Sequence, residues 1–228
     1  MQPLILCLES TDIYCSAALF EGTALMASRN ETQPLAHAEK LAPMVAALCA
    51  EAGRIPDAVA ISRGPGSYTG LRIGASLAKG LCFGWNIPML AIDTLQALAW
   101  SMRQETGAEH HFLFVPMTDA RRMEVYTAVY NCKDLNCMLP VAPRILEPDD
   151  FLEYASAHRV VFAGSGASKW KGLCSWQDQA LFLDQLLPKA EGMGVLAFEA
   201  YREGEFTDAA YFEPFYLKQF QPGKGSVT

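Results

Sequence analysis

The sequence predicts an α/β protein of two lobes, each built on a mixed five-stranded sheet. The first half of the chain begins with three short apolar strands, after which helices and strands alternate. The other half opens in the same order. A strand that rejoins its sheet in parallel needs a crossover, usually a helix, so each half combines antiparallel and parallel pairs. The 228 residues suffice for two lobes of about 100 residues each.

In the first half, apolar runs define the strands, and the spacing of apolar residues defines the helices. Residues 4–8 are apolar without interruption, and Glu21-Gly22 forms a turn between the next two strands. Apolar side chains of the first helix recur at helical spacing until Gly53 ends it. The expected elements are strands at residues 4–8, 14–20, 23–27, 58–62 and 89–92, and helices at residues 35–52, 69–83 and from Thr94 onward.

The second half repeats this order without a residue-level repeat. The expected elements are strands at residues 112–117, 124–131, 138–145 and 160–163, and helices at residues 148–157 and from Ala167 onward. This order is that of ribonuclease H-like domains, and two such lobes are the plan of the actin-like ATPase (ASKHA) superfamily. We expect one lobe at residues 1–100 and the other at 101–228, with the tail from about residue 211 packing back on the first lobe.

Composition excludes several classes of protein. With 51% hydrophobic and 19% charged residues, the chain is far from the composition of disordered proteins. Its net charge of −7 would repel a phosphate backbone, which argues against nucleic-acid binding by the chain alone. No apolar run approaches the ~18 residues of a membrane span, so a cytoplasmic protein without membrane contact is expected. The seven Cys contain no CxxC pair, which indicates reduced thiols.

A glycine-rich loop, RGPGSYTGLR at residues 63–72, lies between a strand and a helix. It is neither a Walker A loop nor a dinucleotide fingerprint, because Leu71 and Thr69 stand where Lys and a third Gly belong. Two interpretations stay open. Free backbone N–H groups at the helix start bind an anion, or the loop is a tight turn capped by Ser67 or Thr69. The loop residues of the anion interpretation are Gly64, Gly66 and Ser67.

Carboxylates at strand ends are the candidate metal ligands. Glu9 and Asp12 follow the first strand, Asp93 ends another, and Asp119 follows the first strand of the second half. In ribonuclease H-like folds such carboxylates bind the metal that handles phosphates. Capping and turn formation is the alternative for the three aspartates. His37-Ala38-Glu39 is no HExxH motif, so a zinc peptidase is not supported. The residues around Ser67 do not form a nucleophile elbow either.

The helix after the glycine loop carries a face of small residues. Gly70, Gly74 and Ala78 fall four residues apart, although each glycine costs about 1 kcal/mol of helix propensity relative to alanine. Such a face lets another backbone approach closely, either within the lobe or across an interface with a partner. We favour the interface, because the first helix is rich in alanine, and weakly apolar positions suit a modest contact.

Four segments of the chain resemble the TsaB (YeaZ) family. They are ILCLEST at residues 5–11, GPGSYTGLRIG at 64–74, DARRMEVY at 119–126 and PFYLK at 214–218. The resemblance extends from the first strand to about residue 218, and the second segment is highly specific. It implies the two-lobed actin-like fold and a non-catalytic role in bacterial tRNA threonylcarbamoyladenosine synthesis, at the adenosine beside the anticodon. Family members pair with the paralogue TsaD, which carries the catalytic metal, and TsaE joins to bind ATP.

The resemblance also implies that this chain has no catalytic residue or metal site of its own. TsaD-like chains carry a His-x-x-x-His metal pair where this chain has Thr94 and Leu98, and Leu cannot bind a metal. No cofactor is then required by this chain, and ATP and a divalent metal are expected on partner subunits. The residues of a vestigial anion or nucleotide site are Glu9, Asp12, Gly64, Gly66, Ser67 and Asp119.

The family's mode of assembly places the partner interface on both helices of the first lobe. The expected partners are TsaD and TsaE type proteins, a second copy when the chain is isolated, and tRNA through the complex only. Gly74→Arg is expected to abolish pairing and to leave the monomer folded. The interface residues so predicted are His37, Leu41, Met44, Val45, Leu48, Gly70, Ile73, Gly74, Leu77, Ala78 and Leu81.

Two other functions stay open. An actin-like ATPase or phosphotransferase acting by itself would use Glu9, Asp12 and Asp119 with magnesium, and ATP turnover by the pure chain would favour it. A glycoprotein endopeptidase, a label once attached to this superfamily, has neither a metal pair nor a nucleophile here.

Overall fold

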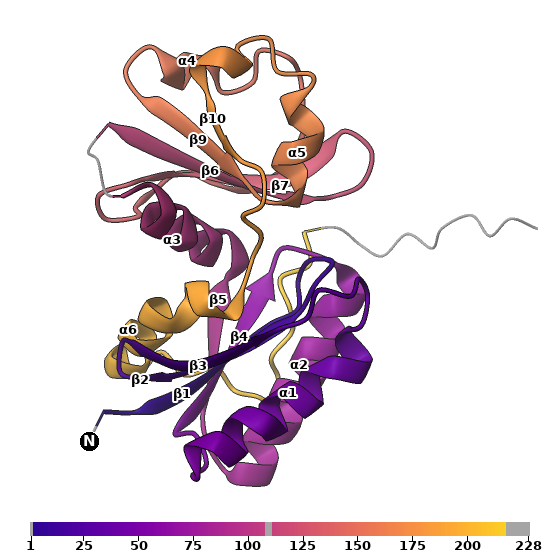
Figure 1. Ribbon diagram of the computed structural model, residues 1–228, viewed down its shortest axis with the longest axis vertical. Helices are drawn as coiled ribbons and strands as arrows, with labels where there is room; N and C mark the ends of the chain where they lie inside the picture. Colours follow the sequence, from indigo (N-terminus) through magenta and orange to yellow (C-terminus); the bar gives the residue numbers. More distant parts are fainter. Residues whose placement is uncertain (1, 108–110, 218–228) are drawn as a thin grey trace, which may run out of the picture.

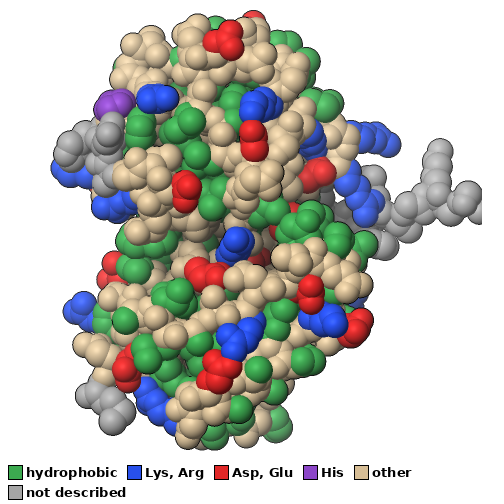
Figure 2. Space-filling model, in the orientation of Figure 1, with side chains coloured by type: hydrophobic (Ala, Val, Ile, Leu, Met, Phe, Trp, Pro, Cys, Tyr) green, Lys and Arg blue, Asp and Glu red, His purple; other side chains and the backbone are tan. Residues whose placement is uncertain are grey.

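The structure is a computed structural model that describes residues 2–107 and 111–217. Lys218, the last residue of the fourth family segment, lies outside the described residues. Two lobes are stacked along the long axis of the molecule, which narrows between them (Figure 1 and Figure 2). Each lobe contains one mixed five-stranded sheet, which confirms the predicted fold class.

The sheet of the first lobe has the order β3-β2-β1-β4-β5. Its first three strands are antiparallel neighbours, whereas β4 joins β1, and β5 joins β4, in parallel. The central strand is buried on both faces, which is why its sequence is apolar without alternation. The strands are β1 (Leu4–Glu9), β2 (Ser16–Glu21), β3 (Ala24–Asn30), β4 (Ala58–Gly64) and β5 (Met89–Asp93).

The sheet of the second lobe has the order β10-β9-β6-β7-β8, which is the same topology. Its antiparallel pairs are β6 with β7 and β7 with β8, and its parallel pairs are β6 with β9 and β9 with β10. The predicted duplication of topology is therefore confirmed. The strands are β6 (Phe112–Asp119), β7 (Glu124–Asn131), β8 (Cys137–Ile145), β9 (Arg159–Ala163) and β10 (Leu181–Leu183).

Helices cover both faces of each sheet (Figure 1). In the first lobe, α1 (His37–Ala52) and α2 (Tyr68–Trp85) pack on one face, and α6 (Gly194–Glu203) packs on the other. In the second lobe, α5 (Ser165–Lys171) covers one face together with the short α4 (Leu152–Ala155). No helix within the described ranges is both long and apolar enough to cross a membrane.

Helix α3 (Thr94–Thr106) lies between the two sheets and belongs to both cores. Ala97 packs with the core of the first lobe, whereas Leu95, Leu98 and Met102 pack with the core of the second. Because one helix is buried against both sheets, α3 joins the two lobes through apolar contacts on opposite sides.

Two helices differ from the sequence prediction because residues at their starts adopt positive φ. Leu35 has a φ of 62°, so α1 begins at His37 and not at residue 35. Phe151 also has a φ of 62°, and the Asp150 carboxylate accepts the Glu147 N–H at 2.7 Å. These contacts form a turn over most of the helix expected at residues 148–157, of which only α4 is helical.

The chain returns to the first lobe earlier than residue 211. From Ala190 onward it packs against the first sheet, where the ring of Phe20 occupies the space that a side chain at Gly194 would need. Further along, Thr207 forms a bridge to Met89, and Phe212 is buried in the core beneath α1 and α2. The Phe215 N–H then donates to the Arg63 carbonyl at 2.7 Å. The last described residues therefore line the end of β4, beside the glycine-rich loop.

Candidate functional site between the lobes

The glycine-rich loop after β4 packs tightly against the loop that follows β1. The Ser67 N–H donates to the Thr11 carbonyl at 2.7 Å, and the Ser67 hydroxyl accepts the Gly70 N–H at 3.3 Å, which caps α2. A side chain at Gly66 would overlap the Thr11 carbonyl oxygen. Of the two interpretations of this loop, the contacts favour the capped turn, because the Ser67 N–H and hydroxyl both form hydrogen bonds within the chain itself.

The small-residue face of α2 is inside the lobe, which corrects the prediction of an interface there. A Cβ at Gly70 would overlap the Ser10 carbonyl oxygen, and one at Gly74 would overlap the Ser10 hydroxyl and crowd Ile61. The Ser10 hydroxyl donates to the Gly70 carbonyl at 2.9 Å, which fixes the helix against this loop. The glycines therefore allow a close approach of α2 to its own sheet.

Glu9, at the end of β1, is fully buried. One of its carboxyl oxygens accepts the Thr11 N–H at 2.6 Å, and the other is hydrogen-bonded to the Ser62 hydroxyl. Burial raises the pKa of Glu9 above its ordinary value, although the hydrogen bonds from Ser62 and Thr11 oppose the shift. This carboxyl group thus connects β1, β4 and the following loop inside the core.

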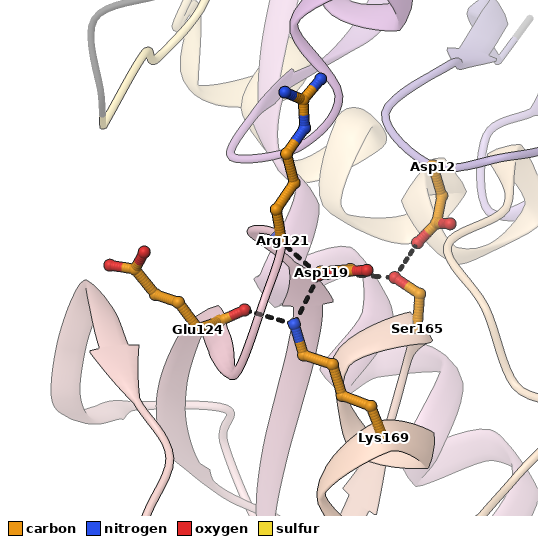
Figure 3. Close-up of polar contacts among 6 residues, drawn as sticks. All are labelled: Asp12, Asp119, Arg121, Glu124, Ser165 and Lys169. Atoms are coloured by element: carbon orange, nitrogen blue, oxygen red, sulfur yellow. Dashed lines mark hydrogen bonds and ion pairs between the residues drawn. The ribbon is translucent and has the colours of Figure 1, made fainter. Parts of the chain in front are cut away.

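Two of the other three predicted acids, Asp12 and Asp119, lie near each other where the two lobes meet (Figure 3). Asp12 Oδ2 accepts the Ser165 hydroxyl of α5 at 2.7 Å, and Ser165 Oγ accepts the Asp119 N–H at 3.1 Å. The Lys169 ammonium bonds both the Asp119 carboxylate and the Glu124 carbonyl. One serine thus joins the two acidic loops, and one lysine neutralises the second of them.

Sequence reasoning missed Ser165 and Lys169. These two residues are four positions apart, about one helical turn, and Ser165 directly follows Gly164, the residue after β9. This spacing puts the hydroxyl and the ammonium on one face of α5, next to the ends of β6 and β7. Asp93, also proposed as a metal ligand, forms a two-pronged ion pair with Arg63 at 2.8 Å and 2.8 Å.

The residues of this cleft do not fit the nucleotide and divalent cation that an actin-like ATPase fold implies. Glu9 has both oxygens bonded inside the core, and Asp12 bonds Ser165 and the Ile13 N–H. Asp119 bonds Lys169 and the Arg121 N–H. Across the part of the chain that the structure describes, no three His, Cys, Asp or Glu side chains converge as metal ligands. The carboxylates act here as acceptors for donors of the same chain.

The two positions equivalent to the TsaD metal pair are also filled by packing contacts. The Thr94 hydroxyl accepts the Gly64 N–H at 3.2 Å, and Thr94 itself is fully buried. Leu98 is fully buried too, and its side chain occupies the space beside Gly164 of the second lobe. Thr94 thus fixes the end of β4 within the first lobe, and Leu98 contributes to the contact between the lobes.

Most of the predicted partner-interface residues are inside the first lobe, so that part of the prediction is wrong. The His37 ring lies 2.9 Å from the Asp12 carbonyl, and Leu48 is fully buried in the core. Met44, Ile73, Leu77 and Leu81 are only half-buried, and their role stays a prediction. The residues buried within the lobe are His37, Leu41, Val45, Leu48, Gly70, Gly74 and Ala78.

The exposed side of the same two helices is a different surface, which we name the outer α1–α2 face. Its side chains are small or apolar, and Arg72 is the one charged residue among them. The charged residues of α1 lie near the two ends of that helix. Phe83 projects from it with 91% of its surface exposed. Figure 2 shows few charged side chains over the middle of α1. Its residues are Ala42, Pro43, Ala46, Ala47, Ala50, Arg72, Ser76, Gly80, Phe83 and Gly84.

Fold and cleft together define a class: two-lobed proteins of the actin-like ATPase fold. The solved structure of the ethanolamine utilization protein EutJ from Carboxydothermus hydrogenoformans is similar in fold alone, with a TM-score of 0.53 and 9% identity over 86% of this chain and 90% of that one. YeaZ from Pseudomonas aeruginosa is more similar, with a TM-score of 0.81 and 32% identity over 95% of this chain and 100% of that one.

Within this class the chain belongs to the TsaB (YeaZ) family, as the resemblance predicts. The family model TsaD, described as tRNA N6-adenosine threonylcarbamoyltransferase, matches residues 31–217. The tRNA threonylcarbamoyladenosine biosynthesis protein TsaB of Escherichia coli is 32% identical over 225 residues, which cover 94% of both chains. The protein of the same name from Haemophilus influenzae is 28% identical over 94% of this chain and 93% of that one.

Proposed function

We propose that this chain is a non-catalytic assembly subunit of the complex that adds threonylcarbamoyl to the tRNA adenosine beside the anticodon. In this role it binds and supports a TsaD-type catalytic subunit in the cytoplasm, and a TsaE-type subunit joins them. The observation that carries the proposal is the outer α1–α2 face, which presents small side chains and the 91% exposed Phe83 to solvent. A large exposed aromatic on a surface of few charges is typical of a protein interface.

The cleft supports the non-catalytic part of this proposal. Glu9 is held inside the core, Asp12 accepts the Ser165 hydroxyl across the lobes, and Asp119 is paired with Lys169 of the same lobe. ATP and a divalent metal would then act on the partner subunits, and this chain would need no cofactor. A pure chain that hydrolyses ATP at a substantial rate would instead favour an actin-like ATPase or phosphotransferase that acts alone.

Light scattering after size exclusion tests pairing with the TsaD-type paralogue of the same organism. We expect a new peak whose mass exceeds that of either protein alone. The chain by itself is expected to form a dimer through the same face, because complementary small-residue faces pack closely. Two separate peaks that keep their individual masses would overturn the proposal.

A matched pair of glycine variants assigns the surface. A side chain at Gly80, on the outer α1–α2 face, and one at Gly172, at the end of α5, would each meet open space. Gly80→Arg is expected to abolish pairing, whereas Gly172→Arg pairs like the wild type; thermal unfolding of both checks that they fold. Gly74→Arg does not test the interface, because its side chain would collide with Ser10 and Ile61 inside the lobe.

A further inference from the structure

The turn between β6 and β7 places two consecutive arginines in the left-handed backbone region. Arg121 has a φ of 70° and Arg122 a φ of 54°. The Glu124 N–H closes the turn on the Arg121 carbonyl at 3.2 Å, and the Arg121 N–H is held by the Asp119 carboxylate at 2.6 Å. Residues with a Cβ adopt this region at a cost, and glycine or asparagine would form the same turn more easily. Strain of this kind is concentrated at functional sites.

Both guanidinium groups lack an internal partner. Arg121 and Arg122 are exposed, and within residues 2–107 and 111–217 neither side chain forms a hydrogen bond, an ion pair or a ring contact. Figure 3 shows the Arg121 side chain pointing away from the cluster of Asp119 and Lys169. Packing within the chain therefore does not account for two strained arginines at this turn.

The charge of the molecule makes this turn unusual. The chain has a net charge of −7, so its surface as a whole repels polyanions, and any contact with them must be local. Figure 2 shows Lys and Arg side chains on both sides of the second lobe in this view. Two exposed guanidinium forks on one turn, without a partner among the described residues, match the geometry of phosphate oxygens.

The turn lies outside the surface that we assign to the proposed partner. The outer α1–α2 face belongs to the first lobe, whereas β6 and β7 belong to the second (Figure 1). An assembly through the two helices thus leaves the arginines free to face another component. In the proposed complex the polyanionic component is the tRNA.

We propose that Arg121 and Arg122 bind phosphates of the tRNA backbone in the assembled complex. The inference rests on the proposed function, because the chain alone is too acidic to hold RNA. The pair positions the RNA and reads no sequence, since phosphate contacts carry none. The turn keeps both arginines exposed, and no described residue competes for their guanidinium groups.

Fluorescence anisotropy with the unmodified tRNA and the complex of this chain with its TsaD-type paralogue tests the inference. The double variant Arg121→Ala and Arg122→Ala is expected to weaken tRNA binding about tenfold and to lower the slope of log affinity against log salt by about 2, one for each lost phosphate contact. The control is Lys133→Gln with Arg202→Gln, two exposed cations that lie elsewhere and whose loss changes net charge equally. The control is expected to change the affinity and the slope by less than about one third as much as the arginine variant does.

A second variant separates function from folding. Arg121→Asn with Arg122→Asn removes the charge and suits the left-handed backbone, so it is expected to unfold at the wild-type temperature or higher and still to lose tRNA affinity. Wild-type affinity in a complex of either arginine variant would overturn the inference and leave the proposed function standing. A variant that no longer forms the complex would show that the arginines contact a protein instead. Failure of the wild-type chain to form the complex would overturn both proposals.

Discussion

Glu9 shows how burial turns a candidate metal ligand into a structural group. Its position at the end of β1 is the one that the sequence marks for phosphate chemistry, yet the carboxyl group is fully buried and bonded to Thr11 and Ser62. Among the described side chains no cation pairs with it, and the nearby charge that acts on it, Asp12, is of the same sign. Burial therefore favours the neutral form and raises the pKa of Glu9.

Glu9→Gln is expected to make the free energy of unfolding fall less steeply as the pH rises. A carboxyl group whose pKa is raised on folding binds more protons in the folded than in the unfolded chain while the pH lies between its unfolded pKa of about 4.3 and its raised folded pKa. Its contribution to the free energy of unfolding therefore falls as the pH rises, by at most about 1.4 kcal/mol per pH unit. Glutamine does not titrate, so that contribution is absent in the variant.

Urea unfolding of both proteins between pH 5 and pH 8 measures this difference. We expect the free energy of unfolding of the variant to gain on that of the wild type as the pH rises from 5, until the pH exceeds the folded pKa of Glu9. A constant difference over the whole range would show that Glu9 titrates alike in the folded and unfolded chains.

The second helix illustrates why an element of small residues is ambiguous in the sequence. Its inner face has Gly70, Gly74 and Ala78, and its outer face has Ser76 and Gly80, so both faces suit close packing. Helical periodicity identifies two faces but does not decide which one meets the sheet when both carry small residues and each also has a large apolar side chain, Leu71 on the inner face and Phe83 on the outer one. The close contact with Ser10, which comes from another part of the chain, decides it in the structure.

Two alanine variants test this assignment of the faces of α2. Gly70→Ala places a Cβ against the Ser10 carbonyl, part of the backbone, and is expected to lower the free energy of unfolding by about 1–3 kcal/mol. Gly80→Ala meets open space and is expected to raise it by about 0.5–1 kcal/mol through helix propensity. Chemical denaturation measures both, and equal effects of the two changes would contradict the assignment.

At the scale of the whole molecule, the sequence predicts the two sheets well because their central strands, such as β1 and β9, are short apolar runs. It fails for α6, which begins at Gly194 and buries the small Ala197, so its helical stripe is faint. It fails also for β10, whose three residues are too short for a pattern. Both elements are stabilised by the rest of the fold.

In the cleft, too, only part of the arrangement can be predicted from the sequence. The acids at strand ends are visible in the sequence because they interrupt apolar runs, but their partners are not. Ser165 is 153 residues from Asp12 along the chain, and Lys169 is 50 residues from Asp119. What the acids do depends on these distant donors, and so the sequence could propose a metal site where the structure has a contact between lobes.

We propose above all that this chain acts through the outer α1–α2 face and not through its cleft. Reconstituted threonylcarbamoylation of tRNA by purified subunits tests it most directly, with two variants of this chain compared side by side. Asp12→Asn with Asp119→Asn is expected to support modification at the wild-type rate once its folding has been checked, whereas Gly80→Arg is expected to abolish it. The claim would be contradicted if the cleft variant folded and paired but supported no modification while Gly80→Arg remained active.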